Sequence, residues 1–294
     1  MLIDLHAHST NTKDCFFDPH DVIQNGKKAG LDGCAFADTD FHEDFEELKS
    51  FGKENGMAVL FGREVCTSGG HLVAFAPDYR SLSSLPWESG SEPPKPEDVI
   101  EHINKIGGAV VAAHPYCREH EHNMGDGIFS LKGLAAIESE NAARGKMTND
   151  LAAEAAFSMQ LPCCGGSDAK QTIEQIGAAA TLFKKDVASE TELIAELKAA
   201  AFWPVKVGDF PPKEERGYGR RDERGGRGRD RRGGSDHQYG GMRSDSAQGR
   251  PFDSTQGRPF NRAQGGRGGD RRDGQRGGRG GGFRGGNRDR GGNR

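Results

Sequence analysis

The stretch Asp4-Leu5-His6-Ala7-His8-Ser9 follows an apolar start and places two histidines two residues apart. If this segment is a β-strand, both imidazole rings lie on the same face of the strand, where they could share one metal ion. A lone His-x-His pair is weak evidence, because many such pairs are ordinary surface or core histidines. The significance of the pair therefore depends on which residues follow the other apolar segments of the chain.

The charge is distributed unevenly along the 294 residues. Residues 1–212 carry 18 Lys and Arg against 33 Asp and Glu, a net charge of −15, whereas residues 213–294 carry 22 and 11, a net charge of +11. The first part also contains nearly all the aliphatic side chains, which suffice for one α/β domain with a single core. We therefore expect an acidic domain over residues 1–207 and a basic tail over residues 208–294.

The sequence also bears on location and redox state. No segment is apolar for long enough to cross a bilayer, and the start of the chain lacks the charged and apolar regions of a secretory signal. We therefore expect a cytoplasmic protein without membrane contact. The six cysteines lack Cys-x-x-Cys spacing, which argues against a zinc ribbon or a disulfide framework. Nothing in the sequence indicates the oligomeric state.

Apolar and amphipathic segments alternate through the first 207 residues. Strands are expected at 2–5, 33–38, 57–65, 71–76, 109–113, 134–139 and 162–166. Helices are expected from Pro19 to Gly30 and at 41–54, 96–106, 147–159 and 190–201, and the Ser- and Pro-rich segment 77–95 is expected to be a surface loop. This alternation favours parallel strands, and hence an α/β barrel or a doubly wound sheet.

Polar side chains follow these apolar segments at their ends, where catalytic groups gather in such folds. The candidates are His6, His8, Asp38, Glu64, His71, His114 and Asp168. Each has an ordinary alternative: an aspartate can cap a helix, and a histidine such as His114 can be a core residue. Together, nitrogen and oxygen ligands on one rim indicate divalent metals, and zinc, manganese and iron all suit such a mixed set.

Seven motifs occur in order along the chain: DLHAHS (4–9), GLDGCAFADTD (30–40), GREV (62–65), HLVAFAPD (71–78), VVAAHPY (110–116), IESEN (137–141) and GGSDAK (165–170). This ordered set resembles the polymerase and histidinol phosphatase (PHP) family over roughly residues 1–207. The resemblance implies a distorted (β/α)7 barrel with a multinuclear metal site that hydrolyses phosphoesters. It also implies two metal positions, one held by His6, His8, Glu64 and Asp168 and the other by Glu64, His71 and His114, with Glu64 as the bridge.

The chain departs from the family pattern at two places. Where the family usually has Thr-Asp-His, this chain has Ala-Asp-Thr at 37–39. Where the family usually has Gly-Ser-Asp-Ala-His, this chain has Gly-Ser-Asp-Ala-Lys at 166–170, so Lys170 replaces the histidine. Both missing histidines belong to the third metal position of the family, which leaves Asp14 as its evident remaining ligand, although His42 or Asp40 could restore one. We therefore predict two metal ions, with the Lys170 ammonium in the vacated place. There it would balance Asp14 or Asp38 and offer a fixed cation to a phosphate oxygen.

Further residues are candidates for contact with the substrate. The guanidinium of Arg118 could bind two phosphate oxygens at once, or it could simply face solvent. Asn141 could orient a ligand or serve packing. Cys117, His120 and His122 could form a lid or a further metal site, or belong to a solvated loop. We assign catalytic roles to Lys170, Arg118 and Asp38, and substrate contacts to Arg118, Lys170 and Asn141.

The segment after Lys213 uses arginine as its permanent cation and interleaves it with glycine and a few aromatic residues. A short repeat, Gln-Gly-Arg-Pro-Phe, occurs at 248–252 and again at 256–260. This composition predicts disorder and resembles the RGG tails of RNA-binding proteins, in which guanidinium groups contact phosphates and stack on bases. The alternatives are an appendage that only keeps the protein soluble or promotes coacervation, and a tail that folds back onto the acidic domain.

Two classes of function follow. The first is a metal-dependent phosphoesterase that acts on a nucleotide, an RNA end or another small phosphorylated metabolite, with the tail raising the local concentration of RNA. The second is a catalytically weak or inactive PHP-fold scaffold that binds RNA through its tail. The enzyme is favoured, because the residues of both remaining metal positions are all present.

Overall fold

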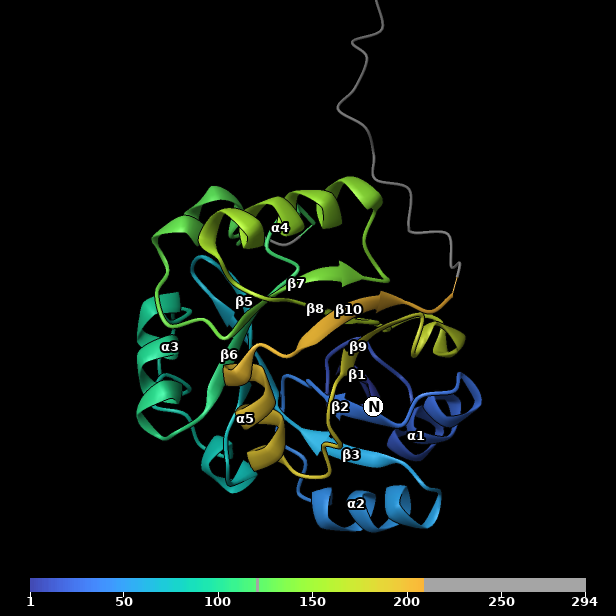
Figure 1. Ribbon diagram of the computed structural model, residues 1–294. Coiled ribbons are helices and arrows are strands. Elements are labelled where there is room, and N and C mark those ends of the chain that lie inside the picture. Colours follow the sequence, from blue (N-terminus) through green and yellow to red (C-terminus); the bar gives the residue numbers. More distant parts are fainter. Residues whose placement is uncertain (120–121, 209–294) are drawn as a thin grey trace, which may run out of the picture. The chain divides into compact units, whose positions relative to one another are not determined.

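The computed structural model describes residues 1–119 and 122–208, in which the strands form two five-stranded sheets (Figure 1). The first sheet has the order β10-β9-β1-β2-β3, and the second has the order β4-β5-β6-β7-β8. The strands of the first sheet are β1 (Leu2–Ala7), β2 (Gly33–Phe36), β3 (Ala58–Phe61), β9 (Ala179–Phe183) and β10 (Phe202–Lys206). Those of the second are β4 (Arg63–Thr67), β5 (Gly70–Phe75), β6 (Ala109–Ala113), β7 (Ala136–Asn141) and β8 (Cys163–Gly166).

Helices lie around the outside of the strands (Figure 1). They are α1 (Pro19–Lys28), α2 (Phe45–Glu54), α3 (Pro96–Lys105), α4 (Lys146–Met159) and α5 (Glu190–Ala199), and short 3-10 helices occupy Tyr79–Leu82, Gly125–Ser130 and Ile173–Gln175. The start of α1 follows from its sequence, because the Asp18 side chain accepts a hydrogen bond from His20 N and proline stands at the first helical position.

The two faces of the strands build two apolar clusters. One cluster takes Ile3 and Leu5 from β1, alternate residues from strands of both sheets, and Leu193 and Leu197 from α5. The other packs the opposite faces of the strands against α1 to α4. Strands of both sheets therefore share one inner cluster.

The α/β class agrees with the sequence prediction, but the (β/α)7 barrel does not appear as a closed ring of paired strands in the described residues. At one seam the sheets are linked by Asp168 N, which donates to His6 O at 2.7 Å, and by an isolated bridge between Ala7 and Ala169. At the other seam Glu64 N donates to Ala37 O at 3.3 Å. The register of β1 against β2 also shifts between Asp4 and Ala7, and such an irregularity bends a strand out of regular pairing.

Several elements differ from the sequence prediction. The segment expected to be one strand at 57–65 is divided into β3 and β4 at Gly62, where a Cβ atom would lie 2.6 Å from Phe75 Cε1. The β5 strand is antiparallel to its neighbours β4 and β6, and the β9 strand is antiparallel to its neighbours β1 and β10, so the strands are not all parallel. The β9 and β10 strands themselves were not predicted.

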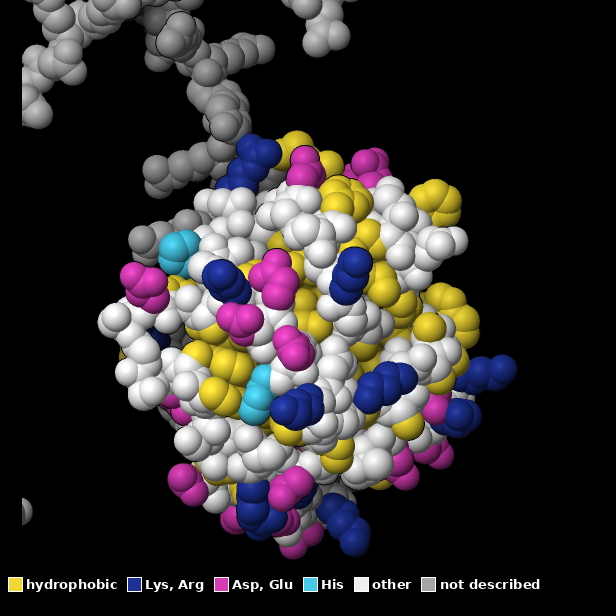
Figure 2. Space-filling model, turned by 90° about the vertical axis from the view of Figure 1, so that its left-hand side faces the viewer, with side chains coloured by type: hydrophobic (Ala, Val, Ile, Leu, Met, Phe, Trp, Pro, Cys, Tyr) yellow, Lys and Arg dark blue, Asp and Glu magenta, His cyan; other side chains and the backbone are white. Residues whose placement is uncertain are grey.

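One face of the domain carries charged side chains of both signs (Figure 2). On the face shown in Figure 2, acidic and basic side chains are interspersed, with apolar side chains between them. No helix within residues 1–119 and 122–208 is long and apolar enough to cross a membrane. The predicted disordered tail lies, apart from residue 208, outside the described residues.

Candidate metal centre

Side chains from several strand ends converge at one end of the inner cluster. His6 lies on β1 and His8 follows it, His114 follows β6, and Asp168 follows β8, while the β4–β5 hairpin provides Glu64 and His71. Except for His71, which is partly exposed, these side chains are buried. A group of histidines and carboxylates without access to bulk water requires either mutual pairing or a cation.

Three sets of ligand atoms lie close enough to hold a metal ion, with the atoms of each set within 4.8 Å of one another. The sets are His6, His8 and Glu64; Glu64, His71 and His114; and His6, His114 and Asp168. Glu64 belongs to two of them, which is the arrangement that a bridging carboxylate needs. The structure thus brings together the residues of both positions expected from the sequence, and Asp168 Oδ1 lies 3.4 Å from His8 Nε2.

Two buried nitrogens in this centre, His6 Nε2 and His8 Nε2, have no hydrogen-bond partner within the described residues. Asp168 Oδ1 lies beside them and has the Lys170 ammonium at 3.0 Å. An unsatisfied buried polar atom costs roughly 1–3 kcal/mol, so native structures seldom keep several of them side by side. Two imidazole nitrogens and a carboxylate oxygen are suitable ligands for a divalent transition metal. The residues present therefore fit a divalent cation.

Neighbouring oxygens fix the orientation of the two imidazoles. Glu138 Oε1 lies 3.0 Å from His6 Nδ1, and Thr12 Oγ1 lies 2.9 Å from His8 Nδ1. The Thr12 hydroxyl donates to Asp38 Oδ1 at 2.6 Å, so it accepts the proton of His8 Nδ1. With their Nδ1 atoms engaged, both rings direct Nε2 toward the centre.

The backbone is strained where two of the ligands lie. His114 has φ of 28° and Asp168 has φ of 48°, in the left-handed region that side chains other than glycine rarely adopt. His114 N donates to Glu138 Oε2 at 2.9 Å, which helps to hold the unusual conformation. Strain of this kind costs on the order of 1–3 kcal/mol and is concentrated at functional sites.

Charge interactions keep the ligand carboxylates ionised. Burial alone would raise the pKa of Glu64 and of Asp168, but the Lys170 ammonium and other neighbouring donors hold both pKa values well below their ordinary range. Burial would lower the pKa of His6, yet Glu138 and Asp168 raise it well above its ordinary value. A cation and a proton compete for an imidazole nitrogen, so metal binding strengthens as the pH rises.

Lys170 reaches into the centre itself. Its Nζ lies 3.0 Å from Asp168 Oδ1 and 3.5 Å from Glu64 Oε2, and a quarter of the side chain is exposed. The ammonium thus lies against two candidate metal ligands rather than against Asp14 or Asp38. Asp14 is exposed and belongs to none of the three ligand sets found among the described residues.

Asp38 lies beside the centre within a network of hydrogen bonds. Its carboxylate accepts from Ser9 N, Ser9 Oγ and Thr12 Oγ1, and it lies 2.7 Å from His42 Nε2. Burial would raise the pKa of Asp38, but its contacts with His42 and His8 lower it. This network holds Thr12, and Thr12 in turn holds His8. His42 is occupied by Asp38 and Asp44 and joins none of the ligand sets.

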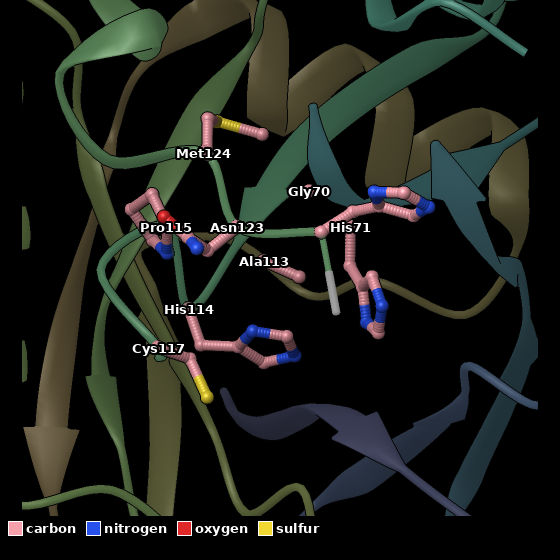
Figure 3. A pocket seen from close by; sticks show the side chains of 9 residues that line it. Gly70, His71, Ala113, His114, Pro115, Cys117, Asn123 and Met124 are labelled. Atoms are coloured by element: carbon pink, nitrogen blue, oxygen red, sulfur yellow. The ribbon is translucent and has the colours of Figure 1, made fainter. Parts of the chain in front are cut away.

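The remaining candidates lie at different distances from the centre. Asn141 Nδ2 donates to Glu138 Oε2 at 2.9 Å and to Asp168 Oδ2 at 3.3 Å, so it orients two of the carboxylates. Arg118 is exposed. His71 and His114 border a small pocket that is also lined by Cys117, Asn123 and Met124, and Cys117 lies beside His114 (Figure 3). His122 also lines this pocket, whereas His120 lies outside the described residues.

The sequence analysis missed three residues of the site, which are Thr12, Glu138 and Arg144. Glu138 contacts both His6 and the His114 backbone, but β7 reads AIESEN, and this mixture of polar residues does not mark Glu138 as the one that faces the centre. Arg144 Nη2 lies 2.7 Å from Asp168 Oδ2. Its contact depends on the parallel pairing of β7 with β8, and no local pattern announces it.

A family model and a curated protein each match part of this chain. Residues 146–202 match the family model described as PHP-associated. The uncharacterized protein MJ1587 of Methanocaldococcus jannaschii is 28% identical over 155 residues, which cover 48% of this chain and 82% of that protein.

Three solved structures share the fold, each at 18% sequence identity. A protein from Bifidobacterium adolescentis assigned as a metal-dependent phosphoesterase has a TM-score of 0.50, with 66% of this chain and 95% of that chain covered. PsfC from Pseudomonas syringae PB-5123 has a TM-score of 0.52, with 69% and 90% covered. An amidohydrolase from Chromobacterium violaceum, solved with bound sulfate and no metal, has a TM-score of 0.50, with 70% and 98% covered.

Proposed function

We propose that this protein belongs to the PHP family and is a metal-dependent phosphoesterase. The observation that carries the proposal is the convergence of two buried imidazole nitrogens without hydrogen-bond partners in the described residues, His6 Nε2 and His8 Nε2, on the carboxylates of Glu64 and Asp168. The fold shared with a protein assigned as a metal-dependent phosphoesterase and with an amidohydrolase supports a hydrolase.

Two divalent ions would be held by this set of residues, one by His6, His8, Glu64 and Asp168 and the other by Glu64, His71 and His114. When bound, such a pair supplies a water activated near neutral pH and positive charge for the phosphoryl oxygens. Manganese, zinc and iron all accept this mixture of imidazole and carboxylate ligands.

The protein's own groups prepare the site for that chemistry. Glu138 and Thr12 hold the imidazoles of His6 and His8 in the orientation that binding needs. The Lys170 ammonium, partly exposed and fixed by Asp168 and Glu64, offers a donor and a positive charge to a phosphoryl oxygen. Because the ligand side chains are buried, little bulk water competes for these charges.

We propose a nucleotide, an RNA end or another small phosphorylated metabolite as the substrate. We also propose that residues 208–294 bind RNA, on the basis of their net positive charge and Arg-Gly composition. The second candidate function, a scaffold that binds RNA mainly through the tail, rests on the same composition, and the cytoplasmic location stays a prediction.

The test is release of inorganic phosphate from nucleoside monophosphates, nucleoside bisphosphates and short RNA in the presence of manganese. We expect the full chain to be active and His6→Ala to be inactive. His20→Ala is the matched control, because His20 is an exposed histidine that pairs with Asp18 and Glu47. Equal activity of the full chain and His6→Ala would refute the enzyme. RNA binding without hydrolysis of any substrate, lost on ending the chain at 208, would support the scaffold.

A further inference from the structure

Arg144 connects the candidate metal centre to the surface. It lies in the loop between β7 and α4, and its side chain is 11% exposed. One arm of its guanidinium, Nη2, lies 2.7 Å from Asp168 Oδ2, and the other, Nη1, lies 3.0 Å from Glu119 Oε2. The guanidinium thus contacts a buried metal-ligand carboxylate and a surface carboxylate at the same time.

The two contacts differ in their exposure to water. The Asp168 side chain is 0% exposed, whereas the Glu119 side chain is 50% exposed. Ion pairs with an exposed partner contribute little to stability, because water and salt compete with them. An incoming anion can therefore replace Glu119 at Nη1, while Asp168 keeps the guanidinium in place.

Arg144 and Lys170 hold the two oxygens of the same carboxylate. Lys170 Nζ lies 3.0 Å from Asp168 Oδ1, and Arg144 Nη2 lies 2.7 Å from Oδ2. Arg144 and Lys170 thus place two positive charges on opposite sides of this carboxylate. A phosphomonoester carries two negative charges, which these two cations match.

We propose that Arg144 binds the terminal phosphate of the substrate together with Lys170, and that Glu119 occupies the phosphate position on Arg144 in the free protein. The inference rests on the proposed function, and it narrows the substrate to a dianionic phosphomonoester in preference to a phosphodiester, which carries a single negative charge. The planar guanidinium suits this role, because its donors match the spacing of phosphate oxygens. In this assignment Arg144 takes the role that the sequence suggested for the exposed Arg118.

The test measures binding of inorganic phosphate to the manganese-loaded full chain by calorimetry. Metal content is measured on every sample. We expect Arg144→Gln to weaken phosphate binding at least tenfold and Glu119→Gln to tighten it severalfold, because the competing carboxylate is removed. Lys146→Gln is the matched control, since this neighbouring lysine is exposed and pairs with Asp150. It should bind phosphate within twofold of the unaltered chain.

A metal-loaded Arg144→Gln protein that binds phosphate as tightly as the unaltered chain would overturn the proposal. If Arg144→Gln loses metal, the variants Arg144→Lys and Glu119→Gln decide whether Arg144 binds phosphate. Metal loss in both arginine variants, together with unchanged phosphate binding by Glu119→Gln, would overturn the proposal and make Arg144 only a positioning residue for Asp168. The assay needs no hydrolysis, so a chain that binds phosphate through Arg144 but cleaves no ester would refute the proposed function and leave this inference standing.

Discussion

Exchanging the Glu138 carboxylate for an amide should weaken metal binding while leaving the fold almost unchanged. Three donors face this carboxylate: His6 Nδ1, His114 N and Asn141 Nδ2. In Glu138→Gln the amide oxygen can still accept from His114 N and Asn141 Nδ2, but the amide nitrogen then faces His6 Nδ1. That ring nitrogen must become the acceptor, which moves the His6 proton to Nε2, the atom that would bind the metal.

The expected size of the effect follows from this change of tautomer. Loss of a partner that orients a metal-bound imidazole typically costs about 10- to 100-fold in metal affinity, or about 1.4–2.7 kcal/mol. Because the shape and two hydrogen bonds are kept, the free energy of unfolding without metal should fall by only about 1 kcal/mol. Glu138→Ala should instead lower it by about 3 kcal/mol, since it leaves buried donors unpaired.

Calorimetric titration with manganese, and denaturant unfolding without metal, separate the two effects. Glu140→Gln is the matched control, because Glu140 lies two residues further along β7 and belongs to none of the ligand sets in the described residues. Nitrogen NMR of the His6 ring reports the tautomer directly. Manganese affinity in Glu138→Gln equal to that of the unaltered chain would refute the reasoning, as would a His6 ring that keeps its proton on Nδ1.

Three further outcomes are expected. Lys170→His should leave the manganese content, measured by mass spectrometry, at about two ions per chain. A third ion would lack ligands, because Asp14 is exposed and Asp38 is already engaged by donors. A third ion in this variant would contradict the prediction. Asp38→Asn should destabilise the protein by about 1–3 kcal/mol at pH 7 in urea unfolding. The loss should shrink below about pH 4, because a carboxylate with a lowered folded-state pKa stabilises fully above its unfolded pKa and progressively less as the pH falls toward its folded pKa. An equal loss at pH 3 would contradict this. Gly166→Ala should lower stability by about 1–3 kcal/mol, because its Cβ would lie 2.4 Å from His6 Cβ, whereas Gly127→Ala meets nothing within 4 Å and should unfold like the unaltered chain.

The sequence was most informative where a ligand follows its own strand directly. The placement of His6, His8 and His114 needs only strand periodicity and the rule that strand ends meet. Glu64 was placed in a continuous strand, whereas the structure divides that segment at Gly62, where the close approach of Phe75 requires glycine. Packing between distant residues sets that division, so no local pattern predicts it.

Other features depend on tertiary structure in the same way. The β10 strand contains Pro204, which argues against a strand in the sequence, but β10 lies at the edge of its sheet, where a proline is tolerated. The partners of Lys170 depend on the left-handed backbone at Asp168, which directs the following residues back toward Glu64. Arg144 reaches Asp168 only after β7 and β8 have paired.

The position of β1 in its sheet has a consequence for biosynthesis. β1 is first in the chain, yet it lies between β2 and β9, with Leu2 opposite Leu182. Its histidines also need Asp168 to complete their ligand set. On the ribosome, the earliest strand must therefore wait with one edge unpaired until nearly the whole domain has been made. Metal can enter a complete centre only late in synthesis, so an early ion would meet His6 and His8 without their carboxylate partner from β8.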